Sequence, residues 1–149
     1  MLRALADACE QRRGAHFAAL FTEDAVYHDV FYGAFAGRAR IAEMIDDWFY
    51  RSARDFRWDF HEPMSDASTL YARYLFSYAS TLPEAGGRRA LFEGVAIMTL
   101  RDGLIADYRE VANTGTGFAD MKFAPARIGK IFERQAAALR ERPEAARHR

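Results

Sequence analysis

Residues 91–113 read LFEGVAIMTLRDGLIADYREVAN, and this stretch decides the fold. Residues 91–101 are apolar and rich in β-branched side chains, which favours a strand. Asp102-Gly103 predicts a tight hairpin turn, because glycine takes the positive φ that the primed turns require. Residues 104–111 resume the alternation and predict the second strand of the hairpin.

Alternation places the side chains of this hairpin on two faces. Phe92 and Met98 share one face of the first strand, and Tyr108 and Glu110 share a face of the second. Both faces of the first strand are largely apolar, so we expect the sheet to be covered on both sides. A phenol and a carboxylate on a covered face predict the lining of a pocket.

Helices are predicted on both sides of this stretch in the chain. Apolar residues recur at helical spacing over residues 2–21, where Gly14 either separates two pieces or bends one helix, and over residues 38–53. Pro125 suits the first turn of a further amphipathic helix over residues 125–142.

The remaining strands are short and alternating. We expect a turn at residues 22–24 and then a strand over residues 25–30. Residues 56–62 and 69–82 alternate and complete an antiparallel meander with the hairpin, in a sheet of five or six strands. Residues 113–119 predict a Gly/Thr loop.

The composition indicates a folded chain without a strongly charged partner. Its 149 residues suit one domain, which we place at residues 1–142, with a flexible tail at residues 143–149. The formal net charge is zero, so we expect neither nucleic acid nor a membrane surface as a partner. Cys9 is the only cysteine and no apolar run reaches about 18 residues, which together favour a cytoplasmic protein.

Two segments carry a family resemblance. Residues 20–41, LFTEDAVYHDVFYGAFAGRARI, and the RDGLI turn at residues 101–105 resemble the NTF2-like superfamily, in its SnoaL-like and ketosteroid isomerase-like branch. The resemblance covers about residues 4–113 and implies an α+β cone, with N-terminal helices packed on a strongly curved, mainly antiparallel sheet. The C-terminal helix is additional to that cone, as a lid or a dimer arm.

The resemblance also implies a homodimer formed through the outer face of the sheet. Five residues are expected on that outer face: Tyr74, Phe76, Tyr78, Val95 and Ile97.

Three residues are predicted to be catalytic: Asp29, Arg73 and Glu110. Asp29 sits where ketosteroid isomerases place their general base, and burial in an apolar cone would raise its pKa toward neutrality. The alternative is a turn aspartate that bonds backbone amides. Parity predicts Arg73 and Glu110 on the concave face, where they would pair with each other.

The sequence carries only part of the catalytic residues of two enzyme families that share the resemblance. Leu5 and Ala96 occupy the positions of the oxyanion donors of ketosteroid isomerases, which argues against steroid isomerisation. Arg73 and Glu110 fall on two positions of the Asp–Arg–Asp set of limonene epoxide hydrolases, but Leu75 replaces one Asp.

A further set of side chains is expected to contact a ligand. The set is Tyr27, Tyr71, Tyr108, Trp48, Phe60, Phe92, Met98, Asn113 and His61. Core packing, or a place at the protein surface, is the alternative for each of them. We expect no metal and no cofactor, because no His, Asp or Glu residues have metal-ligand spacing.

The resemblance and the candidate residues favour a cofactor-independent enzyme. It would act by general acid–base chemistry, as an isomerase, cyclase, dehydratase or hydratase, on a small hydrophobic carbonyl or polycyclic substrate. Two alternatives stay open. One is a non-catalytic protein that binds a hydrophobic small molecule, and the other is a dimeric protein-interaction domain.

Overall fold

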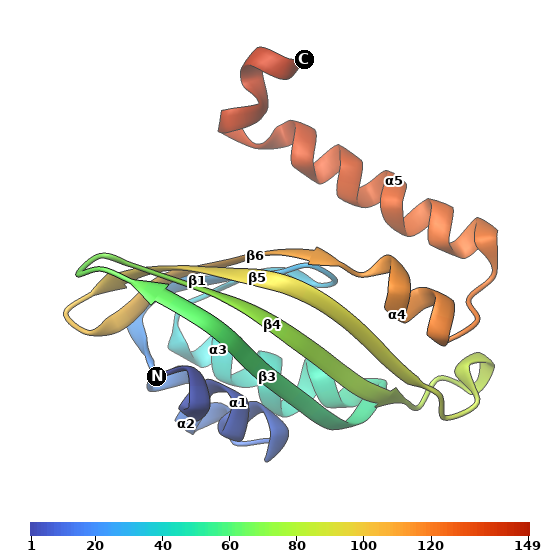
Figure 1. The fold of residues 1–149 in the computed structure, drawn as a ribbon, viewed down its shortest axis with the longest axis horizontal. Helices are drawn as coiled ribbons and strands as arrows, with labels where there is room; N and C mark the ends of the chain where they lie inside the picture. Colours follow the sequence, from blue (N-terminus) through green and yellow to red (C-terminus); the bar gives the residue numbers. More distant parts are fainter.

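A curved, open sheet of six strands forms the frame of the protein (Figure 1). The structure, a computed structural model, describes residues 1–149. The strand order is β2-β1-β6-β5-β4-β3, and every pair of neighbours is antiparallel except β1 and β6. The strands are β1 Phe21–Asp29, β2 Gly33–Ala36, β3 Ala53–Ser65, β4 Thr69–Ser80, β5 Arg89–Arg101 and β6 Leu104–Asn113. The α+β class with a mainly antiparallel sheet is therefore confirmed.

The hairpin predicted over residues 91–111 is formed by β5 and β6. Its turn residues Asp102 and Gly103 both have positive φ, at 53° and 77°, as a primed two-residue turn requires. Arg101 pairs with Leu104 directly across that turn. The strands extend to Arg89 and Asn113, slightly beyond the predicted ends.

Three short helices cover the concave face of the sheet: α1 Leu2–Glu10, α2 Gly14–Ala18 and α3 Arg38–Glu43 (Figure 1). The chain continues from α3 through a π-helical turn, Met44–Trp48, and a 3-10 turn, Phe49–Arg51. This broken helix occupies most of the predicted range 38–53.

Gly14 packs α2 closely on α3. A Cβ at this residue would lie 2.3 Å from the carbonyl oxygen of Ala42. The amide of Gly14 also donates to Oδ1 of Asp46 at 2.7 Å. The helical region is divided into two pieces as predicted, with the break at residues 11–13 and Gly14 as the first residue of the second piece. The close approach explains why residue 14 is a glycine.

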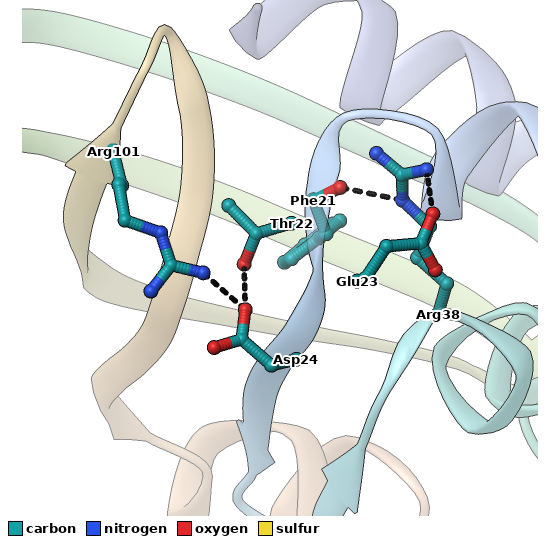
Figure 2. A network of polar contacts seen from close by, with 6 residues as sticks. All are labelled: Phe21, Thr22, Glu23, Asp24, Arg38 and Arg101. Atoms are coloured by element: carbon teal, nitrogen blue, oxygen red, sulfur yellow. Dashed lines mark hydrogen bonds and ion pairs between the residues drawn. The ribbon is translucent and has the colours of Figure 1, made fainter.

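Strand β1 begins at Phe21, so the turn predicted at residues 22–24 is wrong. Figure 2 shows why polar residues can start this strand. Arg38 donates from Nε to the carbonyl of Phe21 at 2.7 Å and pairs with Glu23. Asp24 accepts from the Thr22 hydroxyl at 2.9 Å and pairs with Arg101 of the β5–β6 hairpin. The polar side chains thus tie the first half of β1 to α3 and to the hairpin.

The C-terminal part contains two further helices. The predicted loop over residues 113–119 is instead mostly a short helix, α4 Gly115–Asp120, because Phe118 is buried against β5 and the β1–β2 loop. Helix α5, Pro125–Glu141, buries none of its residues and stands apart from the sheet (Figure 1). Residues Pro143–His148 form a 3-10 helix. None of the helices combines the length and apolar character needed to cross a membrane.

Strand β4 presents the opposite face to the core from the one predicted. Tyr74 and Phe76 are buried, whereas Tyr71 is 46% exposed. Each face of β4 carries both aromatic and polar side chains, so alternation alone cannot choose between them. Pairing makes the choice, because Phe76 lies opposite the core residues Trp58 of β3 and Phe92 of β5.

Candidate functional site

A cavity of about 830 Å³ opens between the concave face of the sheet, the β1–β2 loop, α4 and α5. This volume lies within the usual range for small-molecule sites, roughly 300–1,000 Å³. Most of the lining is apolar or aromatic. From the cone it includes Tyr27, Asp29, Phe49, Trp58, Tyr74, Phe76, Tyr78, Phe92 and Glu110.

Asp29 ends strand β1 and is 8% exposed. Its Oδ1 accepts hydrogen bonds from the amides of Phe31 and Tyr32, both at 2.8 Å. Asp29 therefore does cap a turn, and its Oδ2 accepts no hydrogen bond from the protein. Burial raises the pKa of Asp29 to about 6, against the opposing effect of the two amides. At neutral pH this carboxylate is mostly ionised, with one oxygen left for a ligand.

Glu110 lies on β6 and lines the same cavity. Its Oε2 accepts from the hydroxyl of Tyr74 at 2.7 Å and from that of Tyr108 at 3.4 Å. Burial and then the charge of Asp29 raise the pKa of Glu110 to about 8, although the Tyr74 hydrogen bond opposes the shift. A hydrogen bond from the backbone of Val30 opposes the shift as well, and Glu110 is still mostly protonated at neutral pH.

The two carboxyl groups thus differ in protonation state within one cavity. Environments that push apart the pKa values of two acids are a common way to separate a base from an acid. The neighbouring phenols stay neutral, because burial raises the pKa of Tyr27, Tyr74 and Tyr108 above the ordinary value. The arrangement can accept a proton at one point and donate one at another.

Arg73 is not part of this cavity. Its Nε donates to Glu62 Oε2 and its Nη1 to Glu93 Oε1, both at 2.9 Å, on the outer face of the sheet. The predicted pair of Arg73 with Glu110 is therefore wrong. Tyr71 lies on the same outer face, and His61 lies opposite Arg73 in the β3–β4 register, so neither lines the cavity.

The other predicted ligand contacts are divided between the cavity and the core. Tyr27 and Phe92 line the cavity. Tyr108 is fully buried and stacks on Tyr27, with ring centroids 4.2 Å apart, so it reaches the site only through Glu110. The structure places four further candidates outside the lining: Met98, Trp48 and Phe60 in or against the core, and Asn113 exposed at the end of β6.

Tyr74 is a site residue that the sequence analysis missed, having placed it on the outer face. A signal was present in Gly94, since a glycine inside a strand often marks a close approach. A Cβ at Gly94 would lie 2.5 Å from the Tyr74 ring. Trp58 also lines the cavity, and its indole Nε1 is buried without a hydrogen-bond partner. A bound acceptor or water would satisfy that donor.

The fold is an α+β cone of the NTF2-like class, and two carboxyl groups line its mostly apolar cavity. The SnoaL-like domain matches residues 2–108, and the chain belongs to that family. No curated protein sequence matches the chain.

Solved structures share the fold at low sequence identity. A protein of ketosteroid isomerase-like fold from Catenulispora acidiphila, in complex with trimethylamine, is 13% identical with a TM-score of 0.71, over 83% of this chain and 95% of that one. An LEH-like epoxide hydrolase of M. tuberculosis is 18% identical with a TM-score of 0.65, and the match covers 80% of this chain and 85% of that one. A phenazine biosynthesis-related protein of Pseudomonas aeruginosa is 15% identical with a TM-score of 0.66, and the match covers 83% of this chain and 86% of that one.

Proposed function

We propose that the protein is a cofactor-independent enzyme in which Asp29 is the general base and Glu110 the general acid. One observation carries the proposal. A mostly ionised carboxylate and a mostly protonated carboxyl line the same largely apolar cavity, and Oδ2 of the carboxylate, Asp29, is free of protein hydrogen bonds. The substrate class is a small hydrophobic carbonyl compound, including polycyclic ones.

The proposed chemistry needs only these two groups. Oδ2 of Asp29 removes a proton from the carbon next to the substrate carbonyl, while the carboxyl group of Glu110 donates its proton to the carbonyl oxygen. The product is an enol. Return of the proton to another carbon is an isomerisation, and loss of a β-hydroxyl as water is a dehydration. Tyr74 holds Glu110 in place through its hydrogen bond.

Proton abstraction can be measured without the natural substrate. We would incubate the protein with a panel of cyclic ketones in D₂O and follow deuterium at the α-carbon by mass spectrometry. Asp29→Asn keeps Oδ1 to cap the turn and removes the basic oxygen, so it should fold normally and exchange at the buffer rate. Asp24→Asn, in the same strand outside the cavity, is the matched control. Equal exchange by wild type and Asp29→Asn would exclude Asp29 as the base.

A non-catalytic binding protein is the second candidate, and one observation favours it. Oδ1 of Asp29 caps the turn of the β1–β2 loop, which gives this residue a structural role without chemistry. This candidate predicts that a hydrophobic ligand is retained and recovered unchanged after incubation. Mass spectrometry of the bound and released compound separates it from the enzyme.

We also propose that the outer face of the sheet pairs two copies of the chain. This face exposes apolar side chains on three neighbouring strands: Tyr71 on β4, Val95 on β5 and Val111 on β6. Apolar side chains exposed together on one face often mark a protein interface, and here they lie beside the paired charges of Arg73, Glu62 and Glu93. Tyr74, Phe76 and Tyr78 are not part of it, because they lie on the opposite, concave side of β4 from Tyr71.

A further inference from the structure

Helix α5 brings positive charge to the mouth of the cavity. Arg127 and Arg134 on this helix, and Arg142 directly after it, line the cavity that contains Asp29 and Glu110. One long hydrogen bond connects the helix to the mouth, from Nε2 of Gln135 to the carbonyl of Val30 at 3.4 Å. Val30 follows Asp29 in the chain, so the residue next to Arg134 touches the loop that positions the base.

Two of the three guanidinium groups have no acidic partner. Arg127 is paired with Glu84 and lies over the ring of Phe123, with Cζ 3.8 Å from the centroid. The side chains of Arg134 and Arg142 form no ion pair and no hydrogen bond. Both side chains are exposed, so their charges are solvated and are available to a ligand at the mouth.

The charge on the cavity lining is consequently positive at neutral pH. Arg127 is neutralised by Glu84, and burial raises the pKa of Glu110 to about 8, so that carboxyl is mostly uncharged. Asp29 is then the one ionised acid of the lining, against the two free arginines. A ligand with one negative group would balance this charge, and guanidinium forks bind carboxylates and similar oxyanions in paired hydrogen bonds.

We propose that the substrate of the proposed reaction is an amphipathic acid, whose anionic group is held by Arg134 and Arg142 at the mouth. Its apolar body occupies the cone, and its carbonyl reaches Asp29 and Glu110. The inference rests on the proposed function and deepens it by adding a charged group to the substrate class. It also assigns the additional C-terminal helix a role in substrate selection.

Two fluorescent probes with one aromatic body test this inference on the full-length protein. 1-Anilinonaphthalene-8-sulfonate is anionic, and N-phenyl-1-naphthylamine is its neutral counterpart. In the double variant Arg134→Gln/Arg142→Gln, we expect the anionic probe to bind about 10–100-fold more weakly, since a charge-assisted hydrogen bond is worth about 1.5–3 kcal/mol. The dissociation constant of the neutral probe should change less than about twofold, because the apolar surface that this probe buries is unaltered.

Two controls locate the effect. Arg140→Gln removes an exposed charge from the same helix outside the cavity lining, and it should leave both probes unchanged. Ala112→Trp places a large side chain in the cavity and should weaken the binding of both probes. That result would show that the probes occupy the cavity.

The outcomes separate the two proposals. Equal binding of the anionic probe by wild type and the double variant, or the same loss with Arg140→Gln, overturns the anionic substrate and leaves the cavity and its acid–base pair standing. If neither probe binds the wild type in a way sensitive to Ala112→Trp, the cavity takes no aromatic ligand. In that case the proposed function falls together with this inference.

Discussion

The hydroxyl of Tyr74 lies 2.7 Å from Oε2 of Glu110, although their strands are not neighbours. Strand β5 runs between them, and Gly94 is the β5 residue paired with Tyr74. Since a Cβ at Gly94 would lie 2.5 Å from the phenol ring, Tyr74 can cross the strand only because this residue has no side chain. One glycine thus allows the contact that orients the proposed acid.

The first prediction is that Gly94→Ala damages both stability and the site. The methyl group would displace the buried Tyr74, which should lower the free energy of unfolding by about 1–3 kcal/mol. Loss of the hydrogen bond should raise the pKa of Glu110 above about 8, since that bond favours the ionised form. Urea unfolding and an NMR titration of Glu110 measure the two effects.

Gly129→Ala is the control for that experiment. A Cβ at Gly129 of α5 meets no atom within 4 Å, so this variant should be neutral or slightly stabilising. Unchanged stability and an unchanged Glu110 titration in Gly94→Ala would contradict the steric argument.

The second prediction concerns the pH dependence of turnover. Activity should rise as the pH passes about 6, where Asp29 ionises, and fall as it passes about 8, where Glu110 loses its proton. The two apparent pKa values belong to the interacting pair. Tyr74→Phe should move the alkaline limb to higher pH, because it removes a hydrogen bond that favours ionised Glu110. Rates of deuterium exchange over this pH range check the profile, and a flat profile would contradict the assignment.

The third prediction is that Glu110→Gln stabilises the protein at alkaline pH. The folded state holds the Glu110 proton more tightly than the unfolded chain, whose pKa is near the ordinary value of 4.5. The free energy of unfolding should therefore fall as the pH rises from about 4.5 to about 8. Glutamine keeps an acceptor for Tyr74 without the buried charge.

At about pH 9, Glu110→Gln should be more stable than wild type by on the order of 1–3 kcal/mol, with little difference near pH 5. Urea unfolding at both pH values gives the comparison. Glu93→Gln changes an exposed carboxylate of the outer face and should show no such gain. A gain of equal size at both pH values would point to packing and not to ionisation.

The fourth prediction tests the dimer. Val111 is 66% exposed on the outer face of the sheet, so Val111→Glu should dissociate the pair by placing charges in its apolar interface. Light scattering during size-exclusion chromatography gives the mass. Leu139→Glu places the same charge on α5, where Leu139 is 54% exposed, and should leave the dimer intact. Dissociation by Leu139→Glu alone would identify α5 as the dimer arm.

The sequence by itself determined the fold class and part of the site. Asp102-Gly103 predicted the β5–β6 hairpin because two adjacent residues with positive φ are a local requirement. Helical spacing predicted α1, α3 and α5, and the family resemblance predicted the curved sheet. The position of Asp29 at the end of β1 was likewise readable, since it depends on residues close to it in the chain.

Only the tertiary structure decided which side chains of β4 face the interior of the cone. Alternation defines two faces but does not rank them when both carry aromatic and polar side chains, so Tyr71 and Arg73 were assigned inward in place of Tyr74. The choice comes from pairing with β3 and β5, where Trp58, Phe92 and Gly94 leave room only for that face. The protonation states of Asp29 and Glu110 have the same origin, because burial is produced by packing of distant segments and has no local signal.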